Sequence, residues 1–407
     1  MAIKNIIKLL FPLFILTSCG GNKIEENKDR VMHNYSVYND GVQFDASLWN
    51  NPAYKNEESK DKDEFIKAIY IRSDYIDTES YAFAYLGYPE VKKDKYPAVL
   101  LLHGGGGTAY YEWVKEWNKR GYIALAIDLE GHTPKDSGTL GCAPNDLYEK
   151  SPYLAPHNQN LADENEDLSK TWLYYACKTA IIGNSFLHNL DKVDKNKIGV
   201  CGVSWGGFIT SIITGYDDRF AFSLPIYCTV GQEDSGTPIG EYIKSHPTFK
   251  VFDKIEPLLE INTPLHYFVS GKDKFANPFK ASNFILDMKN SGMSVYPDLL
   301  HSQFHATALT DPYIYADRIL ANYKEIKLDL SNDKVIINTE SGLKINSINL
   351  YTTDENIPST STRWLEEELT LDKDNSCSFT LDSDTSYYYV SILDEKGVIT
   401  SSKVLKL

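Results

Sequence analysis

Two kinds of hydrophobic pattern divide the chain. Three runs of consecutive apolar residues each end in a turn rich in glycine or polar residues, at 96–107 (YPAVLLLHGGGG), 121–132 (GYIALAIDLEGH) and 197–207 (KIGVCGVSWGG). Strands that are apolar on both faces are typical of a parallel sheet covered by helices on each side. After about residue 325 the pattern changes to short β-type runs divided by Asp, Asn, Gly and Ser. This change predicts a small antiparallel β-sandwich in the last part of the chain.

Segments with helical spacing lie between the predicted strands. Helices are predicted at 110–120, 167–190 and 312–323, and further strands at 221–227, 265–270 and 293–296. Strands that alternate with helices predict a doubly wound, mostly parallel α/β sheet with helices on both faces. Before this part, the runs FIKAIYIRS and SYAFAYL between residues 65 and 86 predict an antiparallel pair of strands.

The first residues have the pattern of an export signal. Lys4 and Lys8 are followed by an apolar run that ends in Leu-Thr-Ser-Cys-Gly at 16–20. The run is too short to span a bilayer as a stable helix. The Cys after Leu-Thr-Ser resembles a bacterial lipobox, which implies cleavage before Cys19 and acylation of its thiol. We therefore expect a lipoprotein anchored to a bacterial membrane, at the outer membrane or cell surface. The alternative is an ordinary secretory signal.

Composition narrows the class of protein. The 407 residues are 42% hydrophobic, enough for a large core, and the formal net charge is −15. A nucleic-acid partner is not expected, because binding a polyanion requires clustered Lys and Arg. With Cys19 lipidated, five of the six cysteines remain, and we expect them to be small buried hydrophobes rather than disulfide partners. No spacing resembles a metal site, and no cofactor is expected.

The segment Gly-Val-Ser-Trp-Gly-Gly at 202–207 is the strongest candidate for chemistry. It follows an apolar strand and precedes the helix-like run FITSIITGY, which is the context of a nucleophile elbow. A tight strand-to-helix turn requires small neighbours, which explains the flanking glycines. We expect Ser204 to be a nucleophile. The alternative is a glycine-rich packing turn.

A serine nucleophile requires donors for the oxyanion that forms on its substrate. One donor is predicted to be the N–H of Trp205, directly after Ser204. The second is expected in the glycine run after His103, with Gly105 as the first choice and Gly104 and Gly106 as its neighbours. His103 is expected to order this loop rather than to transfer protons.

The serine also requires a base and an orienting carboxylate, in the chain order Ser, Asp or Glu, His. Asp273 follows the strand predicted at 265–270 and is the favoured carboxylate, with Asp298 as competitor. His301 and His305 follow the next strand. We favour His301 as the base because it is closer to the strand end, and we expect His305 to be a loop or substrate-facing residue.

A long polar stretch separates the second and third apolar strands. The stretch 132–165, which contains His132 and His157, is too polar to belong to the hydrophobic core. This stretch is expected to be a lid or a substrate-binding insertion over the site.

These motifs together resemble a known family. The segments YPAVLLLHGGGGT, RGYIALAIDLEGH, DKNKIGVCGVSWGG, DDRFAFSLPIYC, SGKDKF and YPDLLHSQFH are similar to the prolyl-oligopeptidase-related and acetyl-xylan-esterase-like branch of the α/β-hydrolases. The resemblance implies a triad of Ser204, Asp273 and His301. It extends into the tail, where YYYVSILDEKGVITSS resembles the small β-sandwich of such proteins. One departure is Lys272, where that family usually has Asn before the acid.

The expected organisation has four parts. These are a signal peptide at 1–18, a tether and N-terminal extension at 19–64, an α/β-hydrolase catalytic domain at 65–324 and a β-sandwich at 325–407.

The expected function is hydrolysis of carboxylic esters, with removal of acetyl groups from a carbohydrate as the leading substrate class. A peptidase of the same fold is the first alternative, because fold does not fix substrate. Peptidases of this kind usually carry a large propeller domain, for which the residues before Phe65 are too few. A second alternative is an inactive glycan-binding surface lipoprotein.

Overall fold

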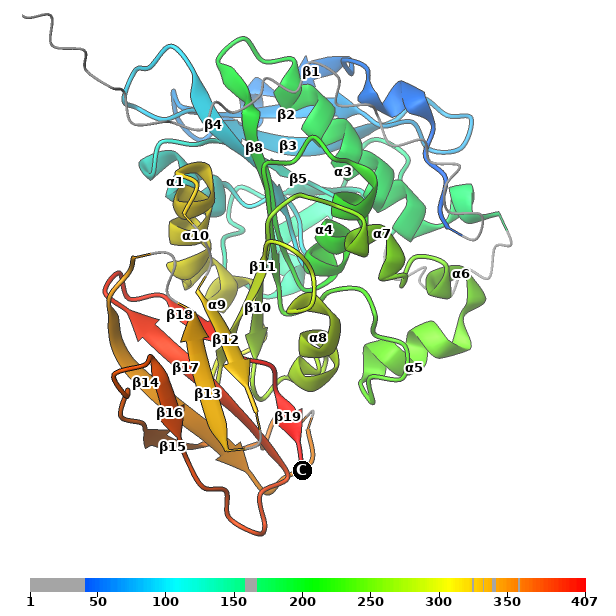
Figure 1. The fold of residues 1–407 in the computed structure, drawn as a ribbon. Helices are drawn as coiled ribbons and strands as arrows, with labels where there is room; N and C mark the ends of the chain where they lie inside the picture. Colours follow the sequence, from blue (N-terminus) through cyan, green and yellow to red (C-terminus); the bar gives the residue numbers. More distant parts are fainter. Residues whose placement is uncertain (1–40, 158–166, 324–325, 332, 339–341, 358) are drawn as a thin grey trace, which may run out of the picture. The chain divides into compact units, whose positions relative to one another are not determined.

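The computed structural model describes residues 41–157, 167–323, 326–331, 333–338, 342–357 and 359–407 (Figure 1). The predicted signal peptide, Cys19 and the tether that follows it lie outside the described residues. Part of the predicted lid, residues 158–166, also lies outside them.

One nine-stranded sheet forms the main framework. Its strands lie in the order β1-β2-β3-β5-β4-β8-β9-β10-β11. They span β1 (Tyr54–Asn56), β2 (Ile66–Arg72), β3 (Tyr81–Gly87), β4 (Tyr96–Leu102), β5 (Ile123–Ile127), β8 (Val193–Val203), β9 (Phe222–Ile226), β10 (Leu265–Ser270) and β11 (Ser291–Tyr296). The pairs from β1 to β5 along this order are antiparallel, and the pairs from β5 to β11 are parallel. The mostly parallel sheet with an antiparallel lead-in confirms the predicted fold class.

Helices cover both faces of this sheet (Figure 1). The longer helices are α1 (Tyr111–Lys119), α3 (Trp172–His188), α4 (Trp205–Tyr216), α5 (Pro238–Ser245), α8 (Pro278–Ile285) and α10 (Asp311–Leu320). The shorter ones are α2 (Pro144–Leu147), α6 (Pro247–Lys250), α7 (Glu256–Leu259) and α9 (Gln303–Ala308). Helices α1 and α10 lie together on one face, where the rings of Trp117 and Tyr313 are 4.6 Å apart. Helices α3 and α4 lie together on the other, joined by the hydrogen bond from Asn184 to Asp217.

Burial explains why β3 and β5 contain no charged residues. All seven residues of β3 and all five of β5 are buried, because helices cover the sheet on both sides. No helix within the described ranges is both long and apolar enough to cross a membrane.

Two further antiparallel sheets follow α10. The first contains β12 (Lys327–Leu330), β13 (Lys334–Asn338) and β16 (Ser376–Ser378). The second contains β14 (Ile345–Thr353), β15 (Leu365–Glu368), β17 (Tyr387–Asp394), β18 (Ile399–Ser401) and β19 (Leu405–Lys406). Apolar side chains from both sheets form a separate small core, which includes Val335, Leu350 and Val390. The C-terminal antiparallel β structure expected from the sequence is therefore present.

These C-terminal strands also cover the edge of the main sheet. The N–H of Val295 in β11 donates to Ser401 Oγ in β18 (2.9 Å), and Ser294 Oγ donates to the carbonyl of Ile399 (2.5 Å). Tyr389 and Val398 are part of the main core rather than of the small one. The exposed backbone groups of an edge strand invite pairing with other chains, so this cover protects β11.

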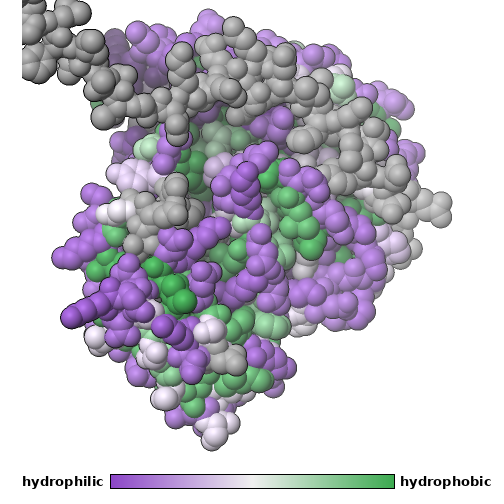
Figure 2. Space-filling model, in the orientation of Figure 1, coloured by the Kyte–Doolittle hydropathy of each residue, from purple (hydrophilic) through white to green (hydrophobic). Residues whose placement is uncertain are grey.

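Polar side chains dominate the face of the molecule in Figure 2, and the apolar residues on it form small separate patches. Apolar residues scattered in this way are normal for a protein surface and do not indicate a docking site.

Candidate active site

The turn between β8 and α4 places one serine in a strained conformation. Ser204 has φ 56° and ψ −117°, in a region that residues with a Cβ rarely adopt. A Cβ at Gly202 would lie 2.1 Å from the carbonyl oxygen of Gly206, and one at Gly206 would lie 2.1 Å from that of Leu102. The glycines of the motif are therefore a steric requirement of this turn.

Three of the residues selected from the sequence lie in one line of hydrogen bonds. His301 Nε2 is 2.8 Å from Ser204 Oγ, and His301 Nδ1 is hydrogen-bonded to Asp273 Oδ2. The Asp273 side chain is almost fully buried, and its Oδ1 accepts the N–H of Phe275 at 2.8 Å. A buried carboxylate on Nδ1 leaves Nε2 of the imidazole directed at the serine.

The two competing residues are placed elsewhere. Asp298 is 89% exposed and pairs with Lys272 at 2.7 Å. His305 lies on α9, and its Nδ1 is 2.7 Å from Ser302 Oγ. Neither residue contacts Ser204 in the described part of the chain. His305 does line the cavity in front of Ser204, as expected for a substrate-facing residue.

Tyr227, at the end of β9, was missed by the sequence analysis. Its hydroxyl donates to the carbonyl of Leu300 (2.6 Å) and lies 3.2 Å from that of Ser302, on either side of His301. Its ring stacks on the imidazole at 4.3 Å. Burial raises the pKa of Tyr227, so the hydroxyl stays protonated and remains a hydrogen-bond donor. Tyr227 therefore holds the His301 loop in place. No sequence signal singled it out, because these contacts are formed only by the fold.

In the glycine loop after β4, the backbone N–H groups of residues 104, 106 and 107 have hydrogen-bond partners. The N–H of Gly104 donates to Gln303 Oε1 (3.0 Å), and the N–H of Gly106 donates to Glu130 Oε1 (3.0 Å). Between them, the N–H of Gly105 has no hydrogen-bond partner among the described residues, and the same holds for Trp205. Both residues line the cavity with Ser204.

His103 fixes the base of this loop. Its Nε2 accepts the N–H of Leu129 (2.9 Å), and its Nδ1 donates to the carbonyl of Gly104 (2.7 Å). Its Nε2 also lies 3.6 Å from Asp128 Oδ1, and together these contacts fit a role in ordering the loop.

The cavity in front of Ser204 has a volume of about 900 Å³. Its apolar wall is formed by Leu147, Trp205, Ile239, Tyr242, Phe275 and Phe304. Gly141, Cys142 and Leu147 belong to the predicted lid, so this stretch contributes directly to the wall. Nearby Cys228 is buried, which raises the pKa of its thiol and keeps it protonated.

Comparison of the sequence and structure with known proteins identifies the fold. No protein-family model matches the sequence. The structure is similar to acetyl xylan esterase 1 of Thermoanaerobacterium sp., with 15% identity and a TM-score of 0.51 over 68% of this chain and 93% of that one. The chain has the α/β-hydrolase fold. An acylaminoacyl peptidase of Pyrococcus horikoshii is also similar, with 16% identity and a TM-score of 0.46, over 65% of this chain and 43% of that one.

One curated protein is similar in sequence. The chain is 30% identical over 137 residues to the probable dipeptidyl-peptidase 5 of Emericella nidulans. The match covers 33% of this chain and 16% of that protein, so the chain spans only a small part of its relative.

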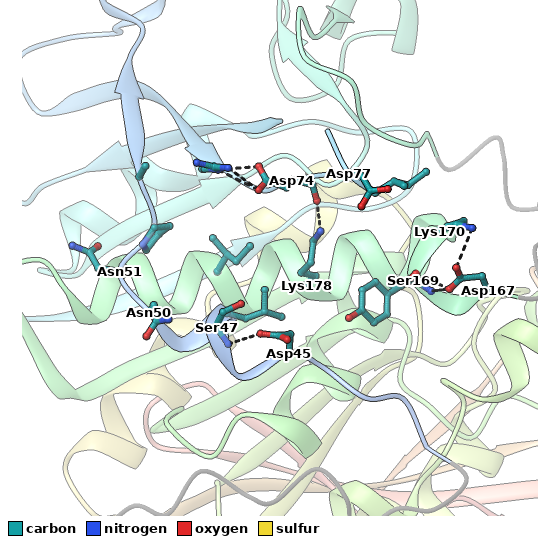
Figure 3. A pocket seen from close by; sticks show the side chains of 17 residues that line it. Asp45, Ser47, Asn50, Asn51, Asp74, Asp77, Asp167, Ser169, Lys170 and Lys178 are labelled. Atoms are coloured by element: carbon teal, nitrogen blue, oxygen red, sulfur yellow. Dashed lines mark hydrogen bonds and ion pairs between the residues drawn. The ribbon is translucent and has the colours of Figure 1, made fainter. Parts of the chain in front are cut away.

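A second cavity, of about 780 Å³, shares no described lining residue with the cavity in front of Ser204 (Figure 3). Two of its ion pairs are Arg72 with Asp74, whose Nε and Oδ1 are 2.9 Å apart, and Lys170 with Asp167, whose Nζ and Oδ2 are 3.1 Å apart. Lys178 donates to the backbone carbonyl of Asp74. No histidine is among its described lining residues, so it offers no counterpart to the Ser204–His301 pair.

The start of the predicted lid differs from expectation. His132 was placed in a stretch too polar for core, but it is only 2% exposed. It begins β6 (His132–Pro134), which pairs with β7 (Tyr148–Lys150), and its ring stacks on Tyr148. The hairpin buries His132 and Thr133 on its first strand, whereas Glu149 and Lys150 on its second strand are exposed.

Three ligand-type side chains meet beside this hairpin. Glu130, His132 and His157 each offer one atom, and these atoms lie within 4.8 Å of one another. The spacing of these residues in the sequence does not resemble a metal-binding motif, because His157 is far along the chain from Glu130 and His132. Burial lowers the pKa of both histidines.

The C-terminal β structure contacts the loop that carries Asp273. Trp364 Nε1 donates to the carbonyl of Gly271 (2.9 Å), and its ring packs edge-on against Tyr389 at 4.8 Å. Gly271 has no room for a side chain here, since a Cβ would lie 2.6 Å from Trp364 Nε1.

Trp364→Ala is therefore expected to destabilise the protein by about 2 kcal/mol, from the lost hydrogen bond and half-buried ring. It should also lower kcat, because the Gly271 loop positions Asp273. The free energy of unfolding from urea denaturation and the turnover of a small ester measure the two effects. Leu365→Ala, at a neighbouring residue that is 69% exposed, is the matched control. It should leave the free energy of unfolding within about 0.5 kcal/mol of wild type and the turnover unchanged. Equal effects of the two variants would show that Trp364 does not support the loop.

Proposed function

We propose that the protein is a serine hydrolase that cleaves carboxylic esters, with Ser204 as nucleophile, His301 as general base and acid, and Asp273 as the residue that orients His301. The observation that carries the proposal is the 2.8 Å contact of His301 Nε2 with Ser204 Oγ, at an elbow where the serine backbone is strained. A nucleophile bonded to a base that is itself oriented by a carboxylate is the arrangement that activates serine.

The reaction runs in two halves. Ser204 Oγ attacks the carbonyl carbon while its proton passes to His301 Nε2. The N–H groups of Gly105 and Trp205 stabilise the negative charge on the carbonyl oxygen. The tetrahedral intermediate expels the alcohol, which takes the proton from His301, and an acyl-enzyme remains. Water then gives a proton to His301, attacks the acyl group and releases the acid, and the proton returns to Ser204.

We propose an acetylated carbohydrate as the substrate. Support comes from the structural similarity to an acetyl xylan esterase, of which the match covers 93% of the chain. The cavity also suits the proposal, because aromatic and aliphatic side chains around an open space of about 900 Å³ can pack against sugar rings. The alternative is a peptidase of the same fold, which the partial sequence match to a dipeptidyl-peptidase favours. The hydrogen-bonded Ser204, His301 and Asp273 speak against an inactive glycan-binding protein.

A hydrolysis screen distinguishes these substrates. Purified protein is incubated with acetylated xylo-oligosaccharides, methyl uronates and aminoacyl amides, and each product is quantified. We expect acetate release with the highest kcat/KM, and none with Ser204→Ala. Faster cleavage of aminoacyl amides would replace the esterase proposal by the peptidase one, and no turnover of any substrate would favour the binding protein.

We also propose that Cys19 carries a lipid anchor that holds the protein at a bacterial membrane. The support is the lipobox-like sequence at 16–20. Acyl chains contribute about 0.8 kcal/mol for each buried methylene, so two or three chains anchor a protein firmly. Cys19→Ala is therefore expected to move the protein from the membrane fraction to the soluble one, as measured by fractionation and immunoblotting. Cys142→Ala should remain with the membranes, and retention of Cys19→Ala there would refute the anchor.

A further inference from the structure

Glu130, His132 and His157 form a cluster next to the glycine loop, and none of the three is among the described residues that line the cavity containing Ser204. His157 Nε2 is 3.8 Å from Glu130 Oε2, and the rings of His132 and His157 are 4.5 Å apart. Glu130 and His132 are almost fully buried, whereas the His157 side chain is 27% exposed. The cluster therefore has a protein interior on one side and access from solvent on the other.

The imidazole of His132 is held with one nitrogen unused. Its Nδ1 is 2.6 Å from the carbonyl oxygen of Gly107 and donates to it, so the Nε2 carries a lone pair. This Nε2 is buried and has no hydrogen-bond partner within the described residues. A buried imidazole nitrogen without a partner is costly, whereas a second ring nitrogen bonded to a carbonyl is the usual support of a histidine that binds a metal.

We propose that Glu130, His132 and His157 bind one divalent transition-metal ion, with Zn²⁺ as the best match. Two imidazoles and a carboxylate are a common protein ligand set for Zn²⁺, and imidazole disfavours Mg²⁺ and Ca²⁺. Ligand atoms around a tetrahedral Zn²⁺ lie about 3.3 Å apart, at metal distances of about 2.0 Å. The observed 3.8 Å between His157 Nε2 and Glu130 Oε2, and the 4.8 Å within which all three ligand atoms lie, therefore require the ligand atoms to move closer by about 0.5 to 1.5 Å when the ion binds.

The ion would connect two segments that border the cavity. Glu130 accepts the N–H of Gly106, and His132 donates to the carbonyl of Gly107, so two ligands already hold the glycine loop. His157 lies beyond β7 at the far end of the described lid residues. A metal bound to all three would hold the described end of this stretch, at His157, against the loop that presents Gly105.

Metal titration of the full purified chain tests this site without reference to hydrolysis. The metal-free protein, in a Cys142→Ser background that removes the partly exposed thiol, is titrated with Zn²⁺ against a chromophoric chelator. We expect one Zn²⁺ per chain and a higher Tm in its presence. His157→Ala should weaken binding by more than about 100-fold and abolish the Tm increase, since loss of even a supporting residue costs 10- to 100-fold. His246→Ala, at a half-buried histidine outside the cluster, should bind as the parent does.

Two results would overturn the site. One is no stoichiometric binding of Zn²⁺ at micromolar concentration, and the other is equal binding by His157→Ala and the parent. Should His157→Ala fail to fold, His157→Gln keeps the size and polarity of the side chain and gives the same comparison. Co²⁺ substitution provides an independent reading, because its absorption spectrum must show tetrahedral nitrogen and oxygen ligands, and an octahedral spectrum or none would contradict the site.

Discussion

Ser204→Ala is expected to lower kcat on an activated ester by about 10⁴- to 10⁶-fold while leaving the fold intact. The residues of a triad act as a unit, so loss of the nucleophile removes nearly all that they contribute, and only binding and oxyanion stabilisation remain. Alanine keeps the Cβ that already fits at φ 56°, and the Ser204 N–H still donates to Ile226. Steady-state kinetics with p-nitrophenyl acetate, together with thermal unfolding, measures both effects.

The matched control is Ser169→Ala, at an exposed serine far from the cavity. Its turnover should equal that of the wild type. Near wild-type turnover in Ser204→Ala would remove Ser204 as the nucleophile, provided that the sample is free of contaminating esterase.

His301→Ala is the second large effect, with an expected loss in kcat of about 10⁴-fold or more on the same small ester. The imidazole is the only described base that contacts Ser204 Oγ, at 2.8 Å. His305→Ala should leave kcat on the small ester nearly unchanged and raise KM for the larger natural substrate, because His305 lines the cavity but is bonded to Ser302. Parallel kinetics of the two variants on both substrates gives the comparison.

The reverse pattern, with His305→Ala inactive and His301→Ala active, would show that the histidine assignment is wrong. A loss of activity in both variants with a normal Tm would instead indicate that α9 must stay intact for the His301 loop to form.

The sequence predicts the elbow well because its constraints are local. The glycines at 202 and 206 have no room for a Cβ, so the motif and the turn imply each other without any knowledge of the remaining fold. The buried strands of the main sheet from β2 onward are predicted for a similar reason, since burial leaves apolar runs, whereas β1 is exposed at all three residues and was not predicted. The order of strands then indicates where an acid and a base can follow Ser204.

Distance from the strand end favours His301 over His305 in the sequence, but the structural reason for their different positions is seen only in the fold. Ser302 accepts the N–H of His305 and caps α9, so the helix begins between the two histidines. His301 stays in the loop facing Ser204, whereas His305 is carried on the helix. A serine three residues before a histidine predicts such a cap only when the helix itself is known.

Contacts between distant segments account for the other omissions. Tyr227 reaches the His301 loop across more than 70 residues, and Trp364 reaches Gly271 from the C-terminal β structure. His132 is buried within a short hairpin, where its ring stacks on Tyr148 of the paired strand, although the stretch that follows it in the sequence is polar. Each of these positions depends on tertiary packing, which hydrophobic periodicity does not encode.

Labelling with a fluorophosphonate is the most direct test of the central claim that Ser204 is an activated nucleophile. The probe reacts with a serine only when a base removes its proton and the oxyanion is stabilised. The folded wild-type protein is treated with the probe, digested and analysed by mass spectrometry. We predict one label per chain on the peptide that contains Ser204, and none in heat-denatured protein, Ser204→Ala or His301→Ala. An unlabelled Ser204 in the folded wild-type protein, or a label on another serine, would contradict the account.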